Sequence, residues 1–135
     1  MLSERFASLQ PVGIFVIRVV LGGIVFAYAV ARFSGGMAAF TAAVTSLALP
    51  RWAASVASWV EFSASIMLLI GLQTRLAAAI ILLFMVLGIR IHFREGLGGY
   101  DAYLSHAAMA LALVFFGAGP WSIDNKSRSA SGRRK

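Results

Sequence analysis

The chain has 135 residues, of which 60% are apolar and only 13% are charged, and its mean hydropathy is +0.85. A soluble domain carries about 25% charged residues, and a domain this small could not bury so much apolar surface in water. Disorder is also excluded, since it requires low hydrophobicity. We therefore predict a single integral membrane domain over residues 1–124.

The net charge and the absence of cysteine limit which partners and cofactors this chain could have. Twelve basic residues outnumber five acidic ones, giving a net charge of +7. The basic residues lie mainly beside apolar stretches, which favours a lipid bilayer over nucleic acid as the partner. The absence of cysteine excludes disulfides, cysteine-ligated metals and covalently attached c-type haem. No metal-binding spacing of histidines and carboxylates is present either.

Four stretches are long and apolar enough to cross a bilayer, which requires about 20 residues in a helix. They are residues 11–33, 52–72, 74–93 and 102–119. Each is a continuous run rich in Ala and Leu, without the alternation that is typical of membrane β-strands. The predicted fold is all-α, a bundle of four transmembrane helices.

The connections add one more element. Within residues 34–51, four apolar side chains recur at steps of three and four: Met37, Phe40, Val44 and Leu47. This pattern predicts a short amphipathic helix between the first two spans, lying in the interface or against the bundle. Residues 125–135 are polar and basic, and we expect a disordered tail there.

An even number of spans puts both termini on one side of the membrane. Seven basic residues fall on that side, namely Arg5, Arg75, Lys126, Arg128, Arg133, Arg134 and Lys135, against four on the other, namely Arg32, Arg51, Arg90 and Arg94. Because positive charge favours the cytoplasmic side, we expect cytoplasmic termini in the plasma membrane, which is the inner membrane of a bacterium.

Arg18 and Glu61 are the charges placed deepest in the spans. A charge at the centre of a span costs about 2.5–3.5 kcal/mol on insertion scales, so such residues usually pair or face a polar path. The two differ in depth by about 6 Å at the helical rise per residue, which an Arg side chain can cover. A buried ion pair between them is therefore expected, serving either as helix–helix glue or as a site for protons or a polar ligand head.

Other polar residues extend these candidates. Ser58 and Ser65 share the helical face of Glu61, and Arg32 shares the face of Arg18. Arg90 and His92 end the third span, where they would attract an anion or a quinone-type head group, or else interact with ordinary lipid headgroups.

Several motifs resemble those of the DoxX family of small four-span membrane proteins. The first span carries an Arg-x-x-x-Gly opening at Arg18 and Gly22. The second carries Glu61 and then a Leu-x-x-Gly-Leu-x-Thr-Arg-x-Ala-Ala pattern. The third has His92 near its end, and a Gly-x-Gly-x-x-Ser-x-Asp pattern follows the fourth. The further matching residues are Gly71, Thr74, Arg75, Gly117, Gly119, Ser122 and Asp124.

The resemblance implies a membrane subunit near quinone-linked redox chemistry. Some members are subunits of thiosulfate:quinone oxidoreductase, and others are linked to oxidoreductase complexes of oxidative stress and thiol homeostasis. Quinone and a soluble or membrane oxidoreductase are therefore the implied ligand and partner, and catalysis by this chain itself stays open, as does its oligomeric state. Two alternatives are a small proton-coupled transporter or channel that uses Glu61, and a structural anchor for a partner enzyme.

Overall fold

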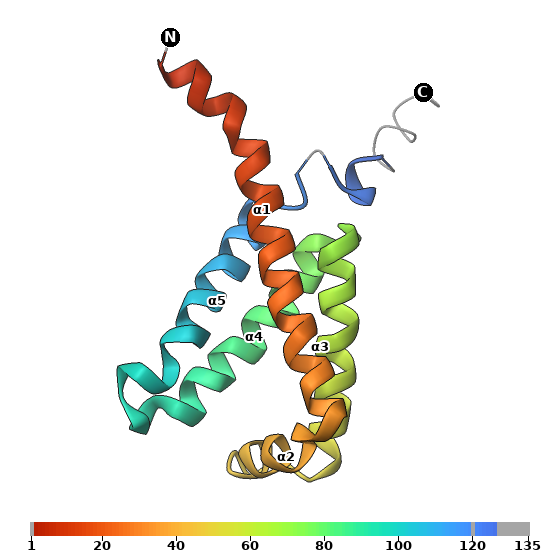
Figure 1. The fold of residues 1–135 in the computed structure, drawn as a ribbon, viewed down its shortest axis with the longest axis vertical. Coiled ribbons are helices and arrows are strands. Elements are labelled where there is room, and N and C mark those ends of the chain that lie inside the picture. Colours follow the sequence, from red (N-terminus) through yellow and green to blue (C-terminus); the bar gives the residue numbers. More distant parts are fainter. Residues whose placement is uncertain (1, 120, 127–135) are drawn as a thin grey trace.

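The computed structural model describes residues 2–119 and 121–126, with side chains from residue 9 onward, and these residues form a helical bundle (Figure 1). The long helices are α1 (Leu2–Ala31), α3 (Trp52–Ile70), α4 (Thr74–His92) and α5 (Leu97–Phe116). Shorter elements are the π-helical turn η1 (Arg32–Gly36), α2 (Met37–Thr45) and the 3-10 turn η2 (Phe93–Glu95). No strand occurs among the described residues, and the all-α prediction is confirmed.

Within the described part of the chain, four helices are long and apolar enough to cross a membrane. Large apolar side chains such as Leu76, Leu83 and Phe115 are more than half exposed on the outside of the bundle. Such a surface is stable in lipid but not in water. The prediction of an integral membrane protein is therefore confirmed by the fold class as well as by composition.

Two helix starts differ from the expected spans. Helix α1 begins at Leu2, so Pro11 lies inside the helix and not in its first turn. Helix α5 begins at Leu97, earlier than the expected Ala102, because Gly98 and Gly99 are part of its first turns. In both helices, therefore, less apolar residues form additional helical turns before the apolar span begins.

Small residues let the long helices pack closely. A Cβ added to Gly22 on α1 would lie 3.1 Å from Cγ of Leu69 and 3.2 Å from Cβ of Leu68 on α3. The buried core likewise alternates alanines with larger side chains, including Leu21, Ala64, Leu68, Ala77, Ile81, Ala110 and Leu113. Packing of small residues is how membrane helices associate when lipid removes the hydrophobic driving force.

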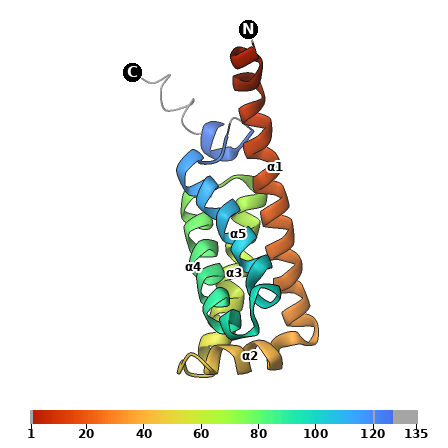
Figure 2. The ribbon, with the colours of Figure 1, turned by 90° about the vertical axis from the view of Figure 1, so that its left-hand side faces the viewer.

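The two ends of the bundle are built differently (Figures 1 and 2). At one end, residues 117–119 and 121–126 lie near the turn between α3 and α4; we call this the capped end. At the other, the chain kinks at Gly35, whose φ of 138° suits glycine, and α2 lies across the bundle. We call this the pocket end. The short helix predicted between the first two spans is therefore confirmed, and it lies against the bundle.

The predicted tail falls largely outside the described residues. Asn125 and Lys126 belong to a short helical turn, whereas the prediction of disorder for residues 127–135 concerns residues that the structure does not describe.

Candidate functional site

A pocket of about 400 Å³ lies at the pocket end between α1, α2, α3, α4 and α5. In Figure 1 the α4–α5 hairpin lies away from α1 and α3 at this end. The walls are mostly apolar, with Phe40, Val44, Leu87 and Ile91 among them. Five polar side chains also line it, namely Tyr28, Arg32, Glu61, His92 and Tyr103.

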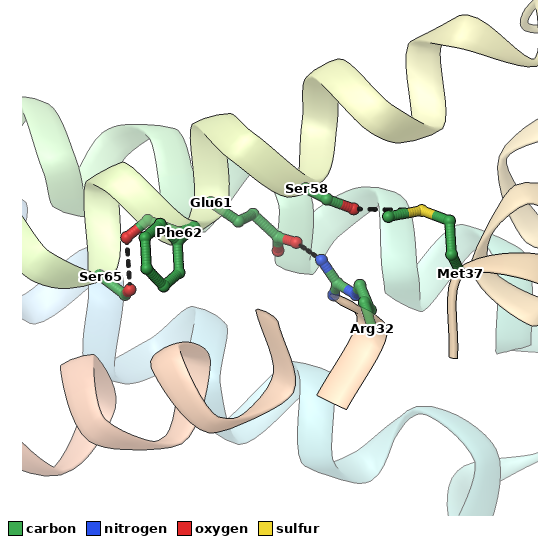
Figure 3. Close-up of polar contacts among 6 residues, drawn as sticks. All are labelled: Arg32, Met37, Ser58, Glu61, Phe62 and Ser65. Atoms are coloured by element: carbon green, nitrogen blue, oxygen red, sulfur yellow. Dashed lines mark hydrogen bonds and ion pairs between the residues drawn. The ribbon is translucent and has the colours of Figure 1, made fainter. Parts of the chain in front are cut away.

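The ion pair in this pocket joins Arg32 to Glu61 (Figure 3). Arg32 Nη1 donates to Oε2 of Glu61, and the two side chains are 19% and 3% exposed. The guanidinium also lies 4.0 Å from the ring centroid of Phe40, which adds a cation–π contact. The pair therefore satisfies the buried carboxylate and leaves part of the guanidinium toward the pocket.

The expected partner of Glu61 was Arg18, and that prediction is wrong. Side chains on a helix lean toward its N-terminus. On α1 this direction carries Arg18 away from Glu61, toward the capped end, and carries Arg32 back along α1 toward Glu61. The depths of Arg18 and Glu61, estimated from the helical rise per residue, are close enough for an ion pair. That estimate does not take into account the direction in which each side chain extends.

Arg18 instead joins α1 to the chain that follows α5. Its Nη1 donates to the Ala118 carbonyl at 2.8 Å and its Nη2 to the Trp121 carbonyl at 2.6 Å. The residue is only 2% exposed. Because charged donors make strong hydrogen bonds with carbonyls, these two backbone carbonyls bind the buried guanidinium.

Gly71 makes room for that contact. It ends α3 with a φ of 72°, and a Cβ there would overlap Arg18 Nη1 and lie 2.6 Å from Cβ of Ser122. The Leu72 amide donates to the Met67 carbonyl at 2.9 Å, as in a glycine-terminated helix. A side chain at this position would meet both steric overlap and backbone strain.

Asp124 closes the same end from the other direction. Its carboxylate accepts the amides of Gln73 at 2.7 Å and Thr74 at 2.9 Å, so it caps the N-terminus of α4. The Asp124 amide donates to the Gly71 carbonyl at 3.1 Å. A carboxylate at a helix N-terminus is also favoured by the helix dipole. The last motif of the sequence is therefore a cap for the turn between α3 and α4.

The other motif residues of this end have comparable roles. Gly117 and Gly119 have φ values of 79° and 72°, which turn the chain after α5. Ser122 donates to the Gly119 carbonyl at 2.8 Å, and Arg75 donates to the Phe115 carbonyl at 3.3 Å. These turns and hydrogen bonds hold the chain that follows α5 in place, which gives the residues a role in the fold.

A second hollow, of about 500 Å³, lies over the capped end and is lined by Thr74, Arg75 and Asp124 among others. The α4 N-terminus, which would otherwise attract an anion, is already occupied by the Asp124 carboxylate. The pocket between α2 and α5 is therefore the better candidate for a ligand.

Ser58 and Ser65 lie on the buried face of α3, as their spacing with Glu61 indicated. Ser58 donates to Sδ of Met37 at 3.8 Å, and Ser65 donates to the Phe62 carbonyl of its own helix at 2.7 Å (Figure 3). Neither hydroxyl bonds Glu61 in these contacts. The polar stripe therefore places one carboxylate in the pocket, while its serines have local partners.

The two candidate residues at the end of the third span lie in different surroundings. His92 lines the pocket, where its ring stacks on Tyr103 with centroids 5.2 Å apart. Arg90 is exposed and is not among the pocket-lining residues. Among the residues that the structure describes, no three His, Asp or Glu side chains gather as a metal site.

Sequence reasoning missed Tyr103 and Glu95 as site candidates. Tyr103 lines the pocket because Gly88 leaves space for its ring against α4. Glu95 contacts Nδ1 of His92 at 3.0 Å. Its position three residues after His92 was the available signal, since helical neighbours at that spacing meet.

The comparisons with known proteins agree with the motifs. The family model described as DoxX matches residues 13–94. No curated protein and no solved structure matches the chain.

Proposed function

This chain belongs to the DoxX family, and from that premise we propose that it is a membrane subunit that binds the ring of a quinone-type lipid in the pocket beside α2. In this proposal the subunit takes part in quinone-linked redox metabolism or in oxidative-stress and thiol metabolism. The observation that carries the proposal is a pocket between the apolar helices in which one ion pair, one histidine and two tyrosines meet apolar walls.

The size and lining suit a flat ring with polar oxygens. A volume of about 400 Å³ lies in the usual range for small-molecule sites. Arg32 and Tyr103 supply hydrogen-bond donors, and Phe40 and Tyr103 supply aromatic faces. A ring that carries two oxygens would satisfy donors on opposite walls, while its apolar tail would lie among the exposed helix surfaces in lipid.

The charge balance favours an uncharged ligand. Arg32 is paired with Glu61, and His92 contacts Glu95, so each cation beside the pocket has an acidic partner. An anion would have to compete with both carboxylates. A neutral ring with carbonyl or hydroxyl oxygens would only need hydrogen bonds.

The proposal includes a location and a partner. With cytoplasmic termini in a bacterial inner membrane, the capped end faces the cytoplasm and the pocket opens near the opposite leaflet. This chain supplies the binding site for the quinone. The electrons for quinone chemistry would come from a soluble or membrane oxidoreductase that is bound to this chain.

Binding of a short-chain benzoquinone to the purified protein in lipid nanodiscs tests the proposal. Gly88→Ala would push the Tyr103 ring into the pocket, because the new Cβ would lie 2.6 Å from its Cε1 atom. We expect binding to weaken about tenfold, as overpacking costs about 1–3 kcal/mol.

Gly98→Ala is the matched control, since a Cβ at Gly98 would meet nothing within 4 Å. It should bind as the wild type does. Absence of binding to the wild type, or equal binding by Gly88→Ala in a folded sample, would contradict the proposal.

The buried carboxylate also favours the alternative of a proton-coupled transporter. Glu61 is an acidic side chain inside a span and adjoins the pocket, as a proton-carrying residue would. In proteoliposomes, Glu61→Gln should then abolish proton-coupled uptake that the wild type shows. Flux retained by this variant, or no flux in the wild type, would leave the binding subunit as the better account.

A further inference from the structure

The ring of His92 is held between two side chains at the edge of the pocket. One face stacks on Tyr103, with the planes 11° from parallel. Nδ1 lies 3.0 Å from Oε1 of Glu95, whose side chain is 60% exposed. His92 and Tyr103 line the pocket, whereas Glu95 does not. His92 therefore connects the pocket with an exposed carboxylate.

Two glycines fix these neighbours. Gly88 leaves room for the Tyr103 ring against α4. At Gly99, a Cβ would lie 2.6 Å from Cβ of Glu95 and 2.9 Å from its Oε2, so the Glu95 side chain lies directly on the α5 backbone. Both neighbours of His92 thus rest on backbone, which limits how far the imidazole can turn.

The contact with Glu95 determines which ring nitrogen meets a ligand. An ionised carboxylate only accepts hydrogen bonds, so it keeps a proton on Nδ1. Nε2 is then an acceptor when the imidazole is neutral and a donor when it is protonated. Neutral His92 would accept a bond from a hydroxyl, and protonated His92 would donate one to a carbonyl.

We propose that His92, positioned by Glu95, makes the pocket select between the oxidised and reduced forms of its ring ligand according to pH. The inference rests on the proposed function, because it assumes that such a ring binds beside His92. At low pH the pocket prefers the carbonyl form, and at higher pH it prefers the hydroxyl form. The other titratable or charged groups around the site are Tyr28 on α1, Tyr103 on α5, Arg32 on η1 and Glu61 on α3, and the last two are paired with each other.

The test measures dissociation constants for a short-chain benzoquinone and for its quinol, the latter under anaerobic conditions. The protein is the full chain in nanodiscs, at about pH 5.5 and about pH 8. We expect the ratio of the two dissociation constants to change about fivefold between the two pH values. A change of this size would follow from the loss of one hydrogen bond between Nε2 and one of the two ligand forms.

His92→Gln should remove this pH dependence. Glu95→Gln should weaken it while retaining binding, because a neutral amide no longer fixes the proton on Nδ1. Glu95 is exposed, so its variant should fold even where a change at His92 perturbs packing. Asp101→Asn is the matched control, since the exposed Asp101 carboxylate accepts the adjacent Ala102 amide, and it should behave as the wild type. Circular dichroism and monodisperse elution check the fold of each variant.

The outcomes separate the two proposals. If both ligand forms bind with a ratio that is independent of pH, the role of His92 is overturned and the proposed function stands. A loss of the pH dependence in Asp101→Asn would also overturn the role of His92. If neither form binds the wild type, the proposed function fails and the inference fails with it.

Discussion

The two ends of the bundle each hold an arginine, buried at one end and half-buried at the other, and the two arginines differ in what they contact. Arg18 at the capped end donates to two backbone carbonyls and lies against Gly71. Arg32 at the pocket end pairs with a carboxylate beside a pocket. An arginine bound by backbone fixes the chain around it, whereas an arginine paired with a side chain at a pocket can also meet a ligand. The depth of a charge in a membrane protein therefore does not show by itself whether the charge is structural or functional.

The largest effect should follow from breaking the ion pair at the pocket end. Glu61→Leu would leave the Arg32 guanidinium without its carboxylate, and loss of one partner of a buried pair costs about 3–5 kcal/mol. The free energy of unfolding, measured by denaturing-detergent titration in mixed micelles, should fall by about that amount.

Two double variants identify the partner of Glu61. Combining Glu61→Leu with Arg32→Met should restore most of the stability, because no unpaired charge is left. Combining Glu61→Leu with Arg18→Met should not, since Arg18 contacts other groups. The reverse result would mean that Arg18 pairs with Glu61 after all.

The next largest effect should come from Gly71→Ala at the capped end. The methyl group would overlap Arg18 and Ser122 at a positive φ, so overpacking and backbone strain together should lower the free energy of unfolding by about 2–4 kcal/mol. Gly23→Ala is the control, because a Cβ there would meet nothing within 4 Å. Quinone binding measured at saturating protein should be retained by folded Gly71→Ala, and a selective loss of binding would contradict the separation of the two ends.

A smaller effect is expected for Asp124→Asn. The Asn side chain keeps one oxygen that can accept from the backbone amide of Gln73 or Thr74. It loses the negative charge that is favoured at the N-terminus of α4. The same detergent titration should show a loss of about 1 kcal/mol. Asp101→Asn is a useful comparison, as the Asp101 carboxylate accepts the adjacent Ala102 amide and joins no two helices. Equal losses in the two variants would argue against a special role of the Asp124 cap.

Sequence patterns predicted individual helices better than the contacts between them. The stripe of Met37, Phe40, Val44 and Leu47 indicated a short helix, and α2 contains the first three. The predicted spans 52–72 and 74–93 leave only a tight turn between them, but they did not indicate that Asp124 would cap it. The place of Tyr103 in the pocket depends on Gly88 of another helix, which no pattern within one span could show.

Composition and periodicity by themselves determined that this chain is a membrane protein of four spans with a short helix between the first two. They could do so because the apolar length of a span and the spacing of a helical face are local properties of the chain. Only the tertiary structure decided that Glu61 pairs with Arg32 and that Arg18 holds the capped end. The reason is physical: a charge must be satisfied somewhere in the bundle, and the direction of each side chain and the path of distant backbone select the partner.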